Sequence, residues 1–478
     1  MTAKVKGKMH EITGIIGGIG ALLPENIIPV ALGVVALGIV VFIHELGHFI
    51  VAKLCGIQVE VFSIGFPPKI MGFRRGETEY RLSWIFFGGY VKLAGMEFED
   101  GVDPRGVKDG YYASPLWTKV AVCACGPAMN ILTAFLLFSY LYVAGFPVPA
   151  NMESTVIGSV VESSPAERAG LKPGDRVLAV NGRAVERWEE VNKSIVYSTT
   201  PAVEISFSRD GARRVERIVP EKDEKLRLKR IGIYPAELIS VDIIDGSPAA
   251  AGGMRNGDFI MTAQGGRVFS FEHLSAVIRA HEGREVRLGL LRKGKAAAAT
   301  VVPRNYPELK RPGIGVMLRT AVGMDELESN GLVVYLYRDP FTWMARNIQE
   351  MYFTLKGLAL RAVSPRGLAG AIGIVQIMSY FMRAGLRQFI YIMAVISVNL
   401  GVLNLLPVPV LDGGHIMIAL IESARRKPIS ARVMTAVQNV FVALLLSFMI
   451  LVSANDVVRI WGESISRLIW KTPPAAKP

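Results

Sequence analysis

Two histidines and a glutamate end a long apolar stretch near the start of the chain. His44, Glu45 and His48 follow residues 26–43, which contain no charged side chain. In a helix, residues four apart lie on one face, so the two imidazoles have the spacing that binds zinc, and Glu45 beside them is a candidate general base. Ionisable groups at membrane depth are costly and mark functional sites. The pattern therefore predicts water activation for peptide-bond hydrolysis within or at the edge of a bilayer.

A second polar segment, residues 404–414, lies inside another apolar run. Its two prolines break a helix and leave backbone groups exposed near membrane depth. Catalytic zinc commonly has three protein ligands and an open position for water, and Asp412 is the candidate third ligand. His415 competes for that role, but it follows two glycines and is expected to face elsewhere as a satisfied polar residue. Without this second segment, the histidine pair would also fit a helix end that meets lipid headgroups.

The elements that must position these residues are membrane helices. Among 478 residues, 51% are hydrophobic, and the mean hydropathy of +0.35 is high for a soluble chain. Four apolar stretches are long enough to cross about 30 Å of hydrocarbon: 27–51, 118–146, 388–411 and 434–455. Residues 1–26 form an N-terminal extension, for which we favour an uncleaved segment over a signal peptide because no small-residue cleavage site is evident. Residues 456–478 form a C-terminal tail.

Basic residues set the expected orientation. They gather between the first and second spans and between the third and fourth: Lys53, Lys69, Arg74, Arg75, Arg81, Lys92, Arg105 and Lys108, then Arg425, Arg426, Lys427 and Arg432. Short loops rich in Lys and Arg stay in the cytoplasm. The segment between spans two and three and both termini are then external, and the zinc site lies toward the cytoplasmic side. The net charge of +13 fits anionic lipid, and with no nucleic-acid motif present we expect no nucleic-acid partner.

Cysteines give little guidance. Cys55, Cys123 and Cys125 all lie in or beside predicted spans. We therefore expect no disulfide in the external segment, and we expect Cys123 and Cys125 to serve packing rather than metal binding.

The external segment contains an internal repeat. Ser164-Pro165-Ala166 recurs as Ser247-Pro248-Ala249, and 247 minus 164 is 83. The same offset carries residues 171–175 onto 254–258, each ending in Gly-Asp, and Gly182 onto Gly265. The repeat predicts two copies of one fold, over residues 153–230 and 231–304.

Each copy reads as a strand, a short helix, a Gly-Asp turn and a second strand. In the first copy, the apolar strand 177–180 closes on an Asn-Gly turn. This order, with the sequence Gly-Leu-Lys-Pro-Gly-Asp at 170–175, resembles a PDZ domain. PDZ domains can bind an extended peptide by strand addition. The alternative, which we favour because no carboxylate-binding loop is evident, is a steric gate above the active site.

Three motifs together resemble those of the site-2 protease family of intramembrane zinc metalloproteases, within it the bacterial branch that regulates sigma-E. They are residues 44–48, Gly126-Pro127-Ala128-Met129-Asn130, and residues 399–414. The resemblance implies zinc held by His44, His48 and Asp412, with Glu45 as the catalytic acid/base. It also implies substrate-binding or oxyanion roles for Asn404 and Asn399. The implied fold has four transmembrane helices, a membrane-associated β-hairpin region and two tandem α+β PDZ domains.

The same resemblance implies a location and a substrate class. The location is the bacterial inner membrane. The substrates are single-span membrane proteins already trimmed outside the membrane, such as anti-sigma factors or remnant signal peptides. Two segments would help to handle them. Within the cytoplasmic loop 52–117, residues 59–91 resemble the family's β-hairpin, although they could equally only pack on the spans. Residues 338–364 carry an amphipathic interfacial helix with the apolar stripe Phe341, Met344, Ile348, Met351, Leu355 and Leu358.

Three other functions remain open from sequence. An inactive membrane scaffold that recruits partners through its PDZ domains would not need all of His44, Glu45, His48 and Asp412. A tethered zinc peptidase for soluble misfolded proteins would need a hydrophilic active-site domain, whereas both ligand segments are apolar. A zinc transporter would need acidic or histidine pairs along several spans, and the sequence has one such cluster.

Overall fold

The computed structural model describes residues 27–96, 104–222, 229–306, 311–319, 322–359 and 368–470. These form two compact units, one made of long helices and a β-hairpin, the other running from Pro147 to Leu336. The predicted N-terminal extension, residues 1–26, lies outside the described residues.

Four described helices are long and apolar enough to cross a membrane, as predicted. They are α2 (Ile27–Leu54), α3 (Leu116–Ala144), α11 (Leu386–Asn404) and α13 (Ala431–Trp470). The third predicted stretch ran to residue 411, but α11 ends at Asn404, before Pro407 and Pro409. The tail predicted from residue 456 is helical as far as Trp470, because polar residues can end an apolar stretch without ending its helix.

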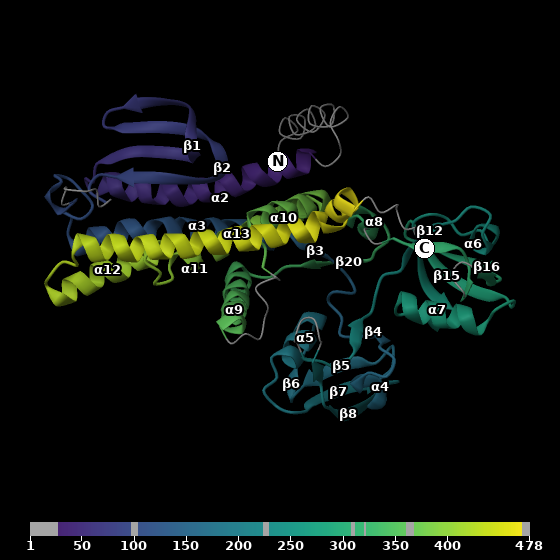
Figure 1. Ribbon diagram of the computed structural model, residues 1–478. Helices are drawn as coiled ribbons and strands as arrows, with labels where there is room; N and C mark the ends of the chain where they lie inside the picture. The colour runs from purple at the N-terminus through teal and green to yellow at the C-terminus, as the bar shows by residue number, and fades with distance from the viewer. Residues whose placement is uncertain are drawn as a thin grey trace. The chain divides into compact units, whose positions relative to one another are not determined.

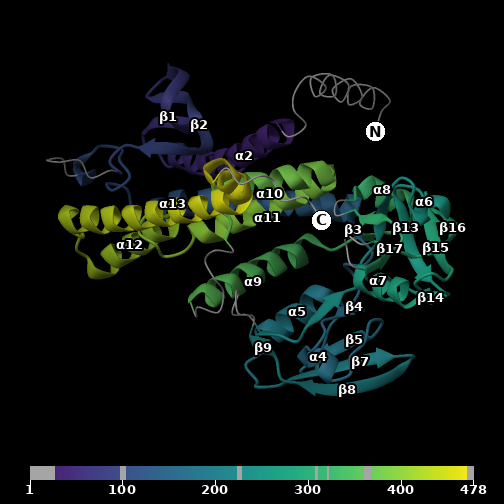
Figure 2. The ribbon, with the colours of Figure 1, turned by 45° about the vertical axis from the view of Figure 1, so that its right-hand side comes forward.

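Small residues let the first three spans approach closely, and α2, α3 and α11 lie side by side (Figures 1 and 2). A Cβ atom added to Gly47 of α2 would lie 2.5 Å from the backbone oxygen of Cys125 in α3. A Cβ atom on Gly401 of α11 would lie 3.0 Å from the oxygen of Pro127. Glycine at these two positions therefore brings the three backbones together around the candidate site.

A short helix that the sequence analysis did not anticipate, α10 (Ala371–Ala384), packs on α2 and α13. Asp456 of α13 is fully buried, and its Oδ2 accepts hydrogen bonds of 2.8 Å from the N–H groups of Gly370 and Gly373. These are the unpaired donors at the start of α10. A carboxylate from one helix thus caps another.

Helix α9 (Pro340–Ala359) occupies most of the predicted interfacial segment, and residues 360–364 of that segment lie outside the described part. Its buried anchor is Trp343, 3% exposed, whose ring centroid is 5.8 Å from that of Phe138 in α3 and 5.2 Å from that of Tyr391 in α11. Phe341, from the predicted apolar stripe, is 70% exposed. One face of α9 therefore packs on the spans, while part of the stripe faces outward.

The hairpin consists of β1 (Val59–Arg75) and β2 (Thr78–Leu93). Phe62 is paired with Val91 on one side and with Tyr80 on the other. The first half of β1 therefore lies between the two ends of β2, and residues 89–93 form an outer edge of the curled sheet. The short helix η1 (Pro104–Gly106) follows in the loop toward α3.

The second unit contains two modules built alike. The first has β4 (Ile157–Val160), α4 (Pro165–Arg168), β5 (Arg176–Val180), β6 (Arg183–Ala184), α5 (Trp188–Val196), β7 (Val203–Arg209), β8 (Ala212–Ile218) and β11 (Ile233–Pro235). The second has β12 (Ser240–Ile243), α6 (Pro248–Ala251), β13 (Asp258–Ala263), β14 (Gly266–Arg267), α7 (Phe271–Ala280), β15 (Val286–Arg292), β16 (Lys295–Val301) and β19 (Val316–Leu318). The remaining elements are β3 (Phe146–Pro149), β9 (Glu221–Lys222), β10 (Lys229–Arg230), β17 (Arg304–Tyr306), β18 (Arg311–Gly313), α8 (Met324–Ser329) and β20 (Val333–Leu336).

The two copies of the predicted repeat make equivalent side-chain contacts. Asp175 and Arg209 form a buried ion pair of 2.6 Å, and Asp258 and Arg292, each 83 residues later, form one of 2.7 Å. Ser164 caps α4 by accepting from the N–H of Glu167, and Ser247 caps α6 in the same way. The two sequence copies therefore adopt the same fold.

The modules end later than predicted. β11 pairs with β4, so the first module extends past residue 230, and β19 pairs with β12, so the second extends past residue 304. A three-residue strand that returns to the first strand has no periodicity of its own, so the sequence pattern does not reveal it.

Candidate metal centre

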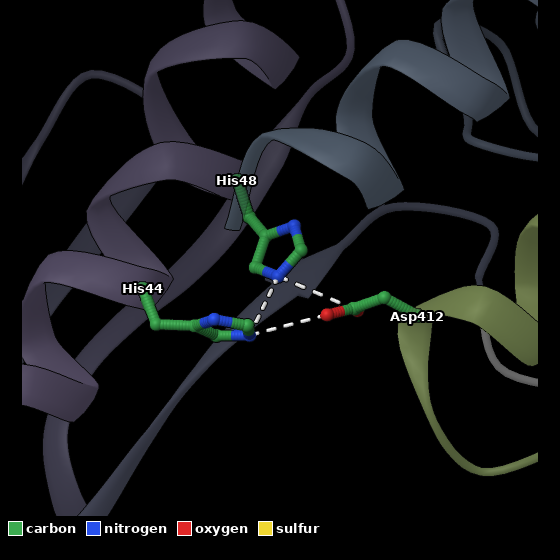
Figure 3. Close-up of side chains that lie close together, drawn as sticks. All are labelled: His44, His48 and Asp412. Atoms are coloured by element: carbon green, nitrogen blue, oxygen red, sulfur yellow. Dashed lines mark hydrogen bonds and ion pairs between the residues drawn. The ribbon is translucent and has the colours of Figure 1, made fainter. Parts of the chain in front are cut away.

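His44 and His48 project from α2 toward Asp412, the first residue of α12 (Asp412–Arg425) (Figure 3). The two Nε2 atoms are 3.2 Å apart. Asp412 Oδ2 lies 3.2 Å from His44 Nε2, and Asp412 Oδ1 lies 3.4 Å from His48 Nε2. Both histidines are buried, at 5% and 9% exposure. Donor groups from two segments far apart in sequence thus converge on one point.

The spacing of these donor atoms fits zinc. In a tetrahedral site with bonds of about 2.0–2.1 Å, neighbouring ligand atoms lie about 3.3–3.4 Å apart. The separation of the two Nε2 atoms, 3.2 Å, and the shortest contact of each imidazole with a carboxylate oxygen of Asp412, 3.2 Å to Oδ2 and 3.4 Å to Oδ1, are close to that value. Two imidazoles and a carboxylate are also a ligand set that leaves a fourth position open, as in catalytic zinc sites.

A hydrogen bond to α3 fixes the tautomer of His48. Its Nδ1 lies 2.8 Å from the backbone oxygen of Val122, which can only accept a hydrogen bond. The proton of the neutral ring is therefore on Nδ1, and Nε2 presents a lone pair to the other donors. Metal-binding histidines characteristically donate their second ring nitrogen in this way.

Asn130 of α3 gives the same support to His44. Its amide lies 3.1 Å from His44 Nδ1, with the nitrogen nearer, and its Oδ1 is buried without a hydrogen-bond partner among the described residues. A half-turn of the amide places Oδ1 against His44 Nδ1, where it accepts the ring proton and leaves Nε2 free for a metal. The sequence analysis named Asn130 within a motif but assigned it no role.

Gly126 provides the space in which His48 sits. A Cβ atom at this position would lie 2.2 Å from His48 Nε2, far inside contact distance. The ring cannot swing away without losing its hydrogen bond to Val122.

We expect Gly126→Ala to weaken zinc binding by about 10–100-fold, the usual effect of disturbing a ligand's support. Zinc affinity measured by competition with a chelator checks this. Gly106→Ala is the control, because a Cβ atom there meets nothing within 4 Å. Wild-type zinc affinity in Gly126→Ala would contradict the geometry.

Two further glycines let Asp412 start a helix beside the end of α11. Cβ atoms on Gly413 and Gly414 would lie 2.2 Å from the backbone oxygen of Leu405 and 2.0 Å from that of Val408. The first turn of α12 therefore packs directly on the proline-containing turn. A carboxylate at a helix N-terminus is also favoured by the helix dipole.

The donors open into a cavity of about 380 Å³. Its other walls include Glu45, Leu400 and Asn404, and the strand residues Gly88, Gly89, Tyr90 and Val91 of β2. The Glu45 side chain lies so close to β2 that a Cβ atom on Gly89 would be 3.3 Å from its Cγ. The cavity thus combines a carboxylate, a metal-type donor set and the outer edge of a sheet.

The other candidate residues for the site, Asn404, Asn399 and His415, do not all lie beside the donor cluster. Asn404 Nδ2 lies 3.2 Å from His44 Nε2 and lines the cavity. Asn399 does not line it, because five residues along a helix turn a side chain about 140° away. His415 is not part of the donor cluster among the described residues, and its ring lies edge-on to Tyr111. Its Nδ1 has no hydrogen-bond partner among the described residues, so it is not the satisfied residue that was expected.

Comparisons with known proteins identify the family of the chain. A family model described as Peptidase family M50 matches residues 32–448. A Neisseria meningitidis protein whose name assigns it to the zinc metalloproteases is 30% identical over 448 residues, covering 89% of this chain and 98% of that protein. The regulator of sigma-E protease RseP of Escherichia coli is 29% identical over 452 residues, covering 89% and 98%. A solved PDZ domain of an SdrC-like protein from Listeria monocytogenes aligns with 19% of this chain and 90% of its own, at 24% identity and a TM-score of 0.16. The chain therefore belongs to peptidase family M50, the site-2 proteases, and is an intramembrane zinc metalloprotease.

Proposed function

We propose that His44, His48 and Asp412 hold the zinc ion and that the cavity around them is where a peptide bond of a membrane-spanning substrate is hydrolysed. The observation that carries this proposal is the cluster of three donor side chains, whose ligand atoms all lie within 4.8 Å of one another, in the same cavity as Glu45. Bound zinc supplies Lewis-acid chemistry, polarising a carbonyl oxygen and making water acidic enough to react.

Glu45 is the proposed proton carrier. Hydrolysis adds the oxygen of a water molecule to the carbonyl carbon and breaks the C–N bond. Glu45 accepts a proton from that water and returns it to the leaving amine nitrogen. Its position supports the role, because Glu45 is on the same helix as two of the donors, lines their cavity and does not belong to the donor cluster.

Asn404 and the outer edge of β2 are the proposed substrate contacts. Asn404 Nδ2 reaches within 3.2 Å of a donor atom, so its amide can donate to the oxygen on which negative charge develops. Residues 89–93 pair with β1 on one side only among the described strands, and their other side borders the cavity. An unwound substrate segment can add there as a further strand, which presents its peptide bonds in extended form. We assign no substrate contact to Asn399.

The proposed location is the bacterial inner membrane, with the two basic loops in the cytoplasm. Arg105 of one loop donates a 2.7 Å hydrogen bond to the oxygen of Ile429 in the other, so both loops lie on the same side. From Leu116, α3 runs 29 residues, about 43 Å, before the second unit begins. That length exceeds the hydrocarbon layer, which supports an outer location for the second unit. Exposed apolar side chains on the hairpin, such as Met71, Phe73 and Trp84 at 63–64% exposure, suit a membrane-associated sheet.

We infer that the two modules of the second unit are PDZ domains that act as a gate. The substrates are single-span membrane proteins whose outer domain has already been removed, the class to which anti-sigma factors and remnant signal peptides belong. A folded outer domain would be held away from the cavity by the bulk of the modules, whereas a short outer tail would pass.

The gate is tested by cleavage of three versions of one tagged single-span substrate by the purified full-length protein. One version has a short outer tail, the second a folded outer domain, and the third an unstructured Gly/Ser segment with as many residues as that domain. We expect cleavage of the first and third and little of the second. Equal cleavage of all three would remove the gate while leaving the zinc chemistry in place, and cleavage of none would count against the proposed substrate class.

A further inference from the structure

A second cavity, of about 360 Å³, lies where α3 begins and α12 ends, apart from the metal centre. Four of its lining side chains are cationic and one is a carboxylate: Arg105, Lys119, Arg426, Lys427 and Glu422. We propose that this cavity binds a phosphate group, with the headgroup of an anionic phospholipid as its source in the membrane. The inference does not depend on the catalytic roles assigned above.

The single carboxylate is already engaged within the protein. Glu422 Oε1 lies 3.2 Å from Arg105 Nη2 and accepts a 2.8 Å hydrogen bond from the N–H of Ile429. Arg105 also donates to the oxygen of Ile429. These contacts join the two basic loops and form one wall of the cavity. The charges of Arg105 and Glu422 therefore largely offset each other.

The other three cations remain for a ligand. Within the part of the chain that the structure describes, no carboxylate lies within ion-pair distance of Lys119, Arg426 or Lys427. The ammonium group of Lys119 lies 5.6 Å from the centre of the Tyr112 ring, another wall of the cavity. A phosphate group offers several strong acceptor oxygens to such a set of donors.

The backbone adds two features that favour an anion at this place. Leu116, the first residue of the 29-residue helix α3, lines the cavity, and the helix start has no side-chain cap, so its free N–H groups and dipole attract negative charge. Arg426 adopts a left-handed conformation, φ 51°, where a helix end usually has glycine. An arginine is thus kept at the cavity wall in spite of its backbone cost.

The surroundings favour a lipid as the source. Trp117, next to the cavity residue Leu116, is 65% exposed, and exposed tryptophans of membrane helices sit at the headgroup level. Basic pockets between helices on the cytoplasmic side are typical headgroup sites. Under the proposed orientation, this cavity faces the inner leaflet.

The test is native mass spectrometry of the full-length protein in neutral detergent, titrated with dioleoyl phosphatidylglycerol, dioleoyl phosphatidylcholine or inorganic phosphate. The matched pair of variants is Arg426→Gln/Lys427→Gln and Arg425→Gln/Arg432→Gln. Each removes two exposed charges at or beside the turn between α12 and α13, but only the first pair lines the cavity. Lys119→Gln removes the half-buried cation of the site, and unfolding temperatures confirm that all variants are folded.

We expect phosphatidylglycerol to bind wild type in preference to phosphatidylcholine. Its affinity should fall about tenfold or more in Arg426→Gln/Lys427→Gln and about fivefold in Lys119→Gln, and stay unchanged in the control pair. Inorganic phosphate binding with the same variant pattern, and competing with the lipid, would support the site but assign it to a soluble phosphate. Equal losses in both double variants, or equal binding of the two lipids in all proteins, would overturn the proposal.

Discussion

Glu45→Gln is expected to reduce peptide-bond cleavage on the order of 10³-fold while leaving the zinc content unchanged. The amide has the shape of the carboxylate but cannot accept the proton of the attacking water. The three donor atoms do not include Glu45, so the metal site is untouched. Cleavage of a short-tailed single-span substrate, measured beside zinc analysis of the same sample, checks both halves of the prediction.

The control for Glu45→Gln is Glu60→Gln, on the neighbouring strand β1. Glu60 is an exposed partner of Lys92 at 3.5 Å and does not line the cavity. Its loss should change neither cleavage nor zinc, because exposed ion pairs contribute little. If Glu45→Gln cleaved its substrate at the wild-type rate, Glu45 would lose the role proposed for it.

Asp412→Asn is expected to weaken zinc binding on the order of 10²-fold or more and to abolish cleavage with it. The change removes the negative charge that faces both histidines at 3.2 and 3.4 Å, and leaves a neutral amide that binds zinc poorly. Zinc retained after dialysis against a graded series of chelator concentrations measures the effect.

His415→Ala is the matched comparison, since it removes a potential ligand three residues from Asp412. His415 is outside the donor cluster, so this variant should keep its zinc. A variant Asp412→Asn that held zinc as wild type does, or a His415→Ala that lost it, would assign the third ligand differently.

The metal donors could be predicted from sequence because each lies in a local pattern. The spacing of His44 and His48 depends only on one helical turn, and Asp412 follows two prolines that interrupt an apolar run. Asn404 could be predicted as a site residue only from the resemblance to a family. Asn399 was included with it by that resemblance, although helix geometry turns it away from the cavity.

The residues that hold the donor side chains in place could not be predicted in the same way. The roles of Gly126 and Asn130 depend on which face of α3 meets α2, and this crossing is set by packing between segments some 80 residues apart. One signal was available: a glycine and an asparagine four residues apart in a mostly apolar helix, which is the spacing that places both on one face.

Long-range pairing explains the other differences. The sequence predicted a hairpin of two strands. It did not predict that the sheet curls and brings Val91 beside Phe62, because this depends on the pairing register between the strands. The closing strands β11 and β19 have three residues each, too few for a periodic pattern. Helix α10 has only 14 residues, so it fell below the length that identifies a span. The repeat, in contrast, was visible because it needs only a comparison of the chain with itself.

The central claim is that His44, His48 and Asp412 bind zinc with an open position beside Glu45. X-ray absorption at the zinc edge of the purified protein tests it without any choice of substrate. The predicted spectrum has a first shell of nitrogen and oxygen at about 2.0–2.1 Å, with the outer-shell features of two imidazoles. A sulfur shell at about 2.3 Å would contradict the assignment, because it would bring Cys123, which also lines the cavity, into the site as a ligand.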